Sequence, residues 1–202
     1  MVVLRFDETE LIVQIDTLEP SLRVAFAAAC AERLRPAYGC FSSITGRGNT
    51  TEFNVIIDRL WEDLDGQSMT IIEIKEKIDT CIELIPREDD GVWIPEQACA
   101  EDAAAALAYA LRCRWNCQSQ EAAWAARRAY EAMDHRVMTL EDIDPKVPGN
   151  EALLASHRLV QAELTRQSRD LHDLLGFTEA DAPMAAAKLR ERAKKEASTV
   201  FG

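Results

Sequence analysis

Apolar side chains recur every three or four residues through almost the whole sequence, which is the spacing of one face of a helix. The pattern is fullest at Phe53, Ile56, Ile57, Leu60, Trp61 and Leu64, which fall at i, i+3, i+4, i+7, i+8 and i+11. No segment alternates apolar and polar residues for long enough to indicate a strand. The chain also has 30 Ala against 3 Tyr, and Ala is the best helix former. The sequence therefore predicts an all-α fold.

Capping residues, prolines and glycines divide the periodic segments into about eight helices. Asp7 is expected to cap the first helix, because Glu10 follows at the capping-box spacing. Pro36 is expected to end the second, since the residue before a proline disfavours helix. The expected ranges are 7–18, 21–35, 49–64, 70–85, 96–117, 119–137, 150–175 and a short helix after 183. Long connections are then expected near 36–50, 86–95 and 139–150.

Composition does not shift abruptly along the chain, and no repeat of 20–50 residues is visible, so residues 1–202 are expected to form one multi-helix bundle domain. A chain of this length buries roughly 70% of its unfolded surface, enough for a core without metals or disulfides. The six cysteines are interpreted mainly as small buried apolar residues.

No metal or cofactor is expected. Cys113 and Cys117 share a helix face but lack a second ligand pair, and the sequence has no Glu-x-x-His. No signal peptide or membrane-spanning run is expected either, which favours the cytoplasm.

The net charge is −12, and it is unevenly distributed. Residues 1–100 contain 9 Lys/Arg against 19 Asp/Glu, whereas residues 101–202 contain 14 against 16. Such a chain repels phosphate backbones, so nucleic acid is an improbable partner. The last helix is the basic exception, but Glu191 and Glu196 interleave with its cations. Cations near a helix C-terminus are the favoured interpretation there.

Acidic residues gather at the end of the third expected helix, where the helix dipole disfavours them. They are either solvated or bind a partner. Asp58 and Glu62 are spaced i, i+4, and Asp65 follows at i+3, so the three share a face. The candidate partner-binding residues are Asp58, Glu62, Asp63, Asp65, Glu88, Asp89 and Asp90.

A second chemistry is suggested by Gly46-Arg47-Gly48-Asn49, which precedes a helix start as a phosphate-binding turn does. It lacks both the Gly-Lys-Ser/Thr ending and the preceding strand of a P-loop. A plain connecting loop is the favoured interpretation.

Residues 23–64 carry a more specific pattern. Ala31-Glu32-Arg33 is followed by Pro36-x-Tyr38-x-x-Phe41, by Thr45-Gly46 and Gly48, and later by Leu60-Trp61-x-x-Leu64. This pattern resembles the signature of the YjaG-like family, the domain of unknown function 416. The resemblance implies an all-helical bacterial cytoplasmic protein and brings no activity with it.

The signature residues Glu32, Arg33, Pro36, Tyr38, Phe41, Thr45, Gly46, Gly48 and Trp61 are expected to be mainly structural. Glu32 and Arg33 are expected to tie the end of the second helix to the 36–50 loop by charged hydrogen bonds. Tyr38 and Phe41 are expected to pin that loop to the core.

Two functional hypotheses follow. The first is a non-catalytic acidic protein that binds a basic protein partner, for example an immunity protein that neutralises a nuclease-type toxin. The alternative is an enzyme, a hydrolase or nucleotide-handling protein that uses the 36–50 loop, or a regulatory or structural protein.

Overall fold

The computed structural model describes residues 3–87 and 91–201, and over these residues it is built from helices without strands. The helices are α1 (Glu8–Asp16), α2 (Pro20–Thr45), α3 (Thr50–Leu64), α4 (Ile71–Leu84), α5 (Pro95–Asn116), α6 (Ser119–Glu141), α7 (Asn150–Ser156), α8 (Arg158–Leu174) and α9 (Ala182–Val200), with a 3₁₀ turn, η2, over Glu179–Asp181. The prediction of an all-α fold is confirmed. Asp7 caps α1 as expected, because its side chain accepts a hydrogen bond from the Glu10 backbone N–H.

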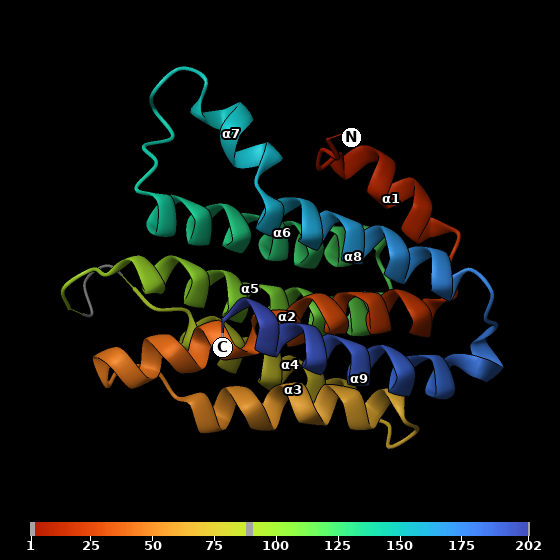
Figure 1. Ribbon diagram of the computed structural model, residues 1–202. Helices are drawn as coiled ribbons and strands as arrows, with labels where there is room; N and C mark the ends of the chain where they lie inside the picture. The colour runs from red at the N-terminus through yellow and green to blue at the C-terminus, as the bar shows by residue number, and fades with distance from the viewer. Residues whose placement is uncertain (1–2, 88–90, 202) are drawn as a thin grey trace.

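Helix α2 runs through the centre of the bundle. Every residue from Val24 to Leu34 is buried, and a helix buried on all sides must be surrounded by others. Its neighbours are α5, α6 and α9, with α3 and α8 completing the enclosure (Figure 1). Any charged residue within this stretch therefore needs a partner from another helix.

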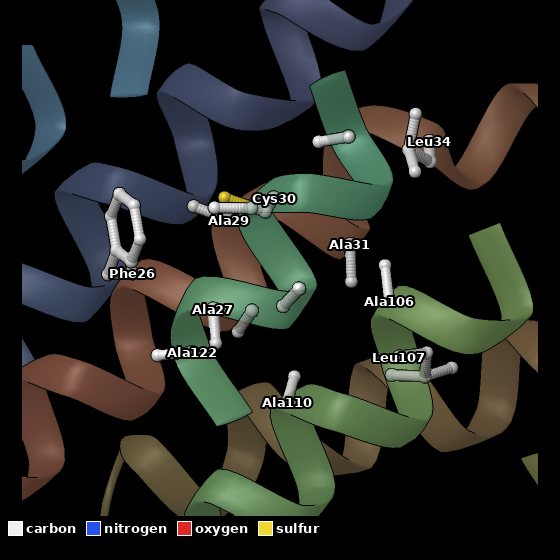
Figure 2. Packing of buried hydrophobic residues seen from close by; sticks show 14 of the residues in the cluster. Phe26, Ala27, Ala29, Cys30, Ala31, Leu34, Ala106, Leu107, Ala110 and Ala122 are labelled. Atoms are coloured by element: carbon white, nitrogen blue, oxygen red, sulfur yellow. The ribbon is translucent and has the colours of Figure 1, made fainter. Parts of the chain in front are cut away.

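Alanine makes this close packing possible. The contacts of α5 with α2 and with α6 are the most extensive in the fold. Figure 2 shows Ala27 and Ala31 of α2, Ala106 and Ala110 of α5 and Ala122 of α6 in the buried cluster. Methyl side chains let three helix backbones approach one another, while Phe26, Leu34 and Leu107 fill the wider spaces around them.

The expected end of the second helix at Pro36 is wrong. Helix α2 continues through Pro36 to Thr45, and Gly46 ends it with φ of 68°. A proline inside a helix costs about 3 kcal/mol through its lost hydrogen bond and ring clash. Full burial of two aromatic side chains, Tyr38 and Phe41, offsets this by roughly 1.5–3 kcal/mol each. The connection expected over 36–50 is therefore only four residues, 46–49.

The helix expected over 150–175 is interrupted at His157. That residue is extended, with φ of −66° and ψ of 143°, and its Nδ1 accepts the backbone N–H of Leu159. His157 thus caps α8 and separates it from α7. The other two long connections lie between Leu84 and Pro95 and between Glu141 and Asn150.

Candidate functional site

The signature carboxylate of Glu32 faces α3 from the buried stretch of α2. It accepts a hydrogen bond from the indole Nε1 of Trp61, at 2.8 Å, and another from Arg35, at 3.2 Å. Only 2% of the Glu32 side chain is exposed. Two signature residues from different helices therefore contact each other directly and hold α3 against α2.

Arg33 points in a different direction, into α8. Its guanidinium donates to Glu163 at 2.9 and 3.1 Å and to Asp170 at 2.7 Å. All three side chains are essentially buried. Glu32 and Arg33 were expected to fasten a loop over 36–50. That expectation is wrong, because those residues are mostly helix and the two charges bind α3 and α8 instead.

Tyr38 does contact the short connection that remains. Its hydroxyl donates to the Leu84 carbonyl at 3.0 Å and accepts the Asn49 backbone N–H at 3.4 Å. Its ring stacks on Phe53 of α3, with centroids 4.6 Å apart. Gly48 has φ of 78°, and a Cβ on it would lie 3.0 Å from the Tyr38 hydroxyl. A side chain at position 48 would therefore be strained and would also press on Tyr38.

The other signature positions in this region also have structural roles. The Thr45 hydroxyl donates to the Phe41 carbonyl and accepts the Arg47 N–H. The Arg47 guanidinium lies over the Phe41 ring at 5.1 Å. Asn49 caps α3 by accepting the Glu52 N–H. These contacts give the Gly46–Asn49 turn a fixed shape.

An open groove of about 590 Å³ lies between α2, α3 and α9. It brings together Glu32 and Pro36 of the signature with two of the candidate acidic residues, Asp58 and Glu62. Its complete lining is Glu32, Arg35, Pro36, Asp58, Glu62, Arg190, Lys194, Ala197 and Ser198. We call it the α2–α3–α9 groove.

Asp58 is the central anion of this groove. Arg35 donates to both of its carboxylate oxygens, at 2.9 and 3.1 Å, and Arg190 of α9 donates to one of them. Burial alone would raise the pKa of Asp58. The hydrogen bonds from Arg35 and the charges of Arg35, Arg190 and Lys194 outweigh burial, so the pKa lies below its ordinary value.

This lowered pKa predicts a pH-dependent contribution to stability. A carboxyl group whose folded-state pKa is depressed stabilises the fold above its unfolded pKa of about 4 and loses that contribution as the pH falls through the folded pKa. The Asp58 side chain is 41% exposed, so the contribution is expected to be about 1 kcal/mol or less. Urea unfolding at pH 7 and pH 3 is expected to show a smaller acid destabilisation in Asp58→Asn than in the wild type. Asp65→Asn, at an exposed position, should leave the difference unchanged, and equal behaviour of the two variants would contradict the assignment.

Of the other candidate acidic residues in the described part of the chain, Glu62 lines the groove with Asp58 and Asp63 does not. Asp63 is buried, where it accepts hydrogen bonds from Arg114 and from the Met69 backbone N–H. It was grouped with solvated or partner-binding acids, but its carboxylate joins α3 to α5. Glu62 and Asp65 are exposed. Glu88, Asp89 and Asp90 lie outside the described residues.

Helix α4 presents an acidic face that the sequence analysis did not single out. Glu76, Asp79 and Glu83 are exposed, and their i, i+3, i+7 spacing places them on one side of the helix. Within the described part of the chain, none of the three has an ion-pair partner within 4 Å.

Isoleucines lie on the same outer surface of α4. Ile71, Ile72 and Ile82 are 63%, 70% and 50% exposed, whereas Ile74 and Ile78 are buried. The buried side of α4 is narrow, with Ile74, Ile78 and Cys81, because α4 packs mainly on one helix, α5. The exposed side of this helix, which we call the α4 outer face, consists of Ile71, Ile72, Glu76, Asp79, Ile82 and Glu83, with the exposed Lys75 among them.

Most cysteines are buried, in agreement with their interpretation as apolar residues. Cys30, Cys81, Cys99 and Cys113 are buried, Cys40 is partly buried and Cys117 is exposed. Burial raises the pKa of the Cys99 and Cys113 thiols to about 12. Among residues 3–87 and 91–201, no three His, Cys, Asp or Glu side chains are grouped as ligands of a metal ion.

None of the helices in the described residues is long and apolar enough to cross a membrane.

Comparison with known proteins identifies the family of this chain. The family model described as "Protein of unknown function (DUF416)" matches residues 10–202. The chain belongs to the DUF416 family. This confirms the resemblance carried by residues 23–64. No protein with a curated description matches the chain.

A solved structure of a DUF416 family protein from Shewanella baltica has the same fold. The two chains are 16% identical and superpose with a TM-score of 0.76, covering 91% of this chain and 93% of the other. The DUF416 fold is therefore retained at low sequence identity, and the arrangement of α2 with its surrounding helices belongs to that fold.

Proposed function

We propose that this protein binds a basic protein partner and that the α4 outer face is its docking surface. The observation that carries the proposal is the exposure of three isoleucines beside three carboxylates that have no ion-pair partner within 4 Å among residues 3–87 and 91–201. Exposed apolar side chains grouped with unpaired charge favour an interface over a merely solvated surface. The proposal keeps the acidic binding protein of the sequence analysis, but its docking residues are those of α4 in place of Asp58 and Asp63.

The energetics of this face favour association with a cation-rich surface. Like charges three or four residues apart on a helix destabilise it by a few tenths of a kcal/mol per pair. Bound lysine or arginine side chains would relieve this repulsion, and burial of the isoleucines would add hydrophobic stabilisation. Complementary charge also raises the association rate at low salt. A basic nuclease-type toxin neutralised by an immunity protein has the chemistry that this face requires.

The docking surface is tested by site-specific crosslinking in the native cell. A photoreactive amino acid replaces Ile72 on the α4 outer face or, as a control, Leu153, which is 58% exposed on α7. Helix α7, at the top of Figure 1, packs on α6 and α8, whereas α4 packs on α5 and α3. The expected result is a discrete adduct with a basic protein from position 72 and none from position 153. An adduct with an acidic protein, or the same adducts from both positions, would contradict the proposal.

Charge reversal then tests whether the carboxylates of the α4 outer face speed association with the partner that crosslinking identifies. The double variant Glu76→Lys/Asp79→Lys is expected to slow association about tenfold at low salt and less at high salt. Stopped-flow or surface-plasmon kinetics measures this rate. The matched control is Glu151→Lys/Glu191→Lys, which makes the same change in net charge on α7 and α9. If both double variants slow association equally, the effect is one of net charge and the α4 outer face is not the docking surface.

A further inference from the structure

Positive charge is concentrated at the α9 side of the α2–α3–α9 groove. Arg35 is neutralised by Asp58 and by Glu32. Arg190 donates to the same Asp58 carboxylate, and Lys194 also faces Asp58 closely enough to lower its pKa. Two guanidinium groups and one ammonium group therefore share one carboxylate that Arg35 already engages through both oxygens.

The hydrogen-bonding capacity of this side is also incomplete. Lys194 has no ion-pair partner within 4 Å in the described residues. Arg190 engages Asp58 through Nη2 alone, and its Nε–H is buried without an acceptor. A buried donor left without an acceptor costs about as much as a lost hydrogen bond. Asp58 thus holds Arg190 in place through Nη2, and within the described residues no acceptor binds its Nη1.

Glu62, the third carboxylate of the lining, has no ion pair with Arg190 or Lys194 within 4 Å. Its nearest cation is Arg59, at 3.9 Å, which does not line the groove. The face of the Arg190 guanidinium lies over the Trp61 ring, 5.8 Å from its centroid, so the indole supports the cation from one side. Arg190 also lines the groove.

From these contacts we infer that the α2–α3–α9 groove binds a small molecule carrying a phosphate group, held by Arg190 and Lys194. One oxygen of a tetrahedral oxyanion accepts a hydrogen bond from Nη1 of Arg190, and a second accepts one from the Lys194 ammonium. Hydrogen bonds from a guanidinium or ammonium group to an oxyanion are charge-assisted and therefore stronger than neutral ones. The lining holds three cations and three carboxylates, and the phosphate group binds at the α9 side, where Arg190 and Lys194 lie.

The net charge of the whole chain favours a small phosphate-containing ligand over a nucleic acid. A net charge of −12 repels an extended polyanion over its length. A single phosphate group feels mainly the cations within a Debye length of about 8 Å. The volume of the groove is within the range of small-molecule sites.

The test is a titration of the full-length protein with inorganic phosphate, followed by NMR at the tryptophan indole N–H resonances. The Trp61 indole N–H is hydrogen-bonded to Glu32 and lies beneath Arg190, and its resonance is assigned with Trp61→Phe. A saturable shift of that resonance is expected with phosphate. No shift is expected with chloride at equal ionic strength or with acetate at equal concentration.

Matched variants on α9 locate the binding group. Lys194→Gln is expected to weaken phosphate binding about tenfold or more. Lys195→Gln makes the same charge change at the next residue, which is exposed like Lys194 but does not line the groove, and it is expected to change affinity less than twofold. Unchanged helical circular dichroism and thermal midpoint in chloride show that both variants fold.

Three results would each overturn the inference. They are a Trp61 response to chloride or acetate equal to that with phosphate, no saturable response to phosphate, and equal weakening by Lys194→Gln and Lys195→Gln. None of them bears on the α4 outer face, which is tested by protein crosslinking.

Discussion

Replacement of Arg33 by alanine is expected to lower the free energy of unfolding by about 3–5 kcal/mol. The substitution leaves Glu163 and Asp170 buried without the guanidinium that bridges them, at 2.9 and 2.7 Å. An uncompensated buried charge costs much more than an exposed one, because the protein interior screens it poorly. For a chain of this length the loss corresponds to a decrease of roughly 10 °C in the thermal midpoint.

The Arg33 effect is measured by urea unfolding and calorimetry beside a matched arginine. Arg127 also contacts two carboxylates, those of Glu8 and Glu131, but its side chain is 48% exposed. Arg127→Ala is therefore expected to cost less than about 1 kcal/mol. Arg33→Lys should fall between the two, since lysine keeps the charge and loses the fork. A loss near 1 kcal/mol for Arg33→Ala would show that the α8 carboxylates find other partners.

Other cations near Arg33 could still pair with the α8 carboxylates when Arg33 is replaced. On the far side of Asp170, Arg169 and Arg192 donate to its second oxygen, at 3.1 and 2.7 Å. Glu196 of α9 accepts from Arg169 at 2.6 Å. The network therefore connects α2, α8 and α9, and several of its cations lie toward solvent. These outer cations limit the loss in Arg33→Ala, but none replaces the donors that face Glu163 from α2.

The helices were predictable from the sequence because each is encoded locally. The apolar spacing of residues 53–64 and the cap at Asp7 depend on neighbours within one or two turns. The errors arose where tertiary packing outweighed a local signal. Pro36 normally ends a helix, but the burial of Tyr38 and Phe41 continues α2 beyond it. The break at His157 depends on one side-chain hydrogen bond inside a segment whose periodicity continues on both sides.

The site was less predictable because its contacts join distant parts of the chain. Arg33 and Glu163 are 130 residues apart, and Asp58 and Arg190 are 132 apart. No local pattern indicates which carboxylate pairs with which cation. The signature contains both Glu32 and Trp61, which contact each other, but the sequence did not predict that contact. The buried state of Asp63 had no comparable signal, since its partner Arg114 lies 51 residues away.

The seam between α2, α5 and α6 shows why so many alanines are needed. In the buried cluster, Ala27, Ala31, Ala106, Ala110 and Ala122 are all fully buried (Figure 2). Protein interiors are packed as densely as organic crystals, so a position that holds a methyl group has no room for a longer side chain. Three helix backbones close to one another cannot move apart at one point without disturbing both helix pairs.

Ala106→Leu is therefore expected to destabilise the protein by about 1–3 kcal/mol or more, although leucine is an excellent helix former and more apolar than alanine. Ala187→Leu is the matched control, because Ala187 lies in the helix α9 and is exposed. There the same change should alter the free energy of unfolding by no more than about 0.5 kcal/mol. Urea unfolding of both variants separates close packing from helix propensity. If Ala106→Leu is as stable as the wild type, the contact between α2, α5 and α6 accommodates a larger side chain, and alanine is not required there for the helices to pack closely. If both variants are equally destabilised, packing at the seam is not the cause.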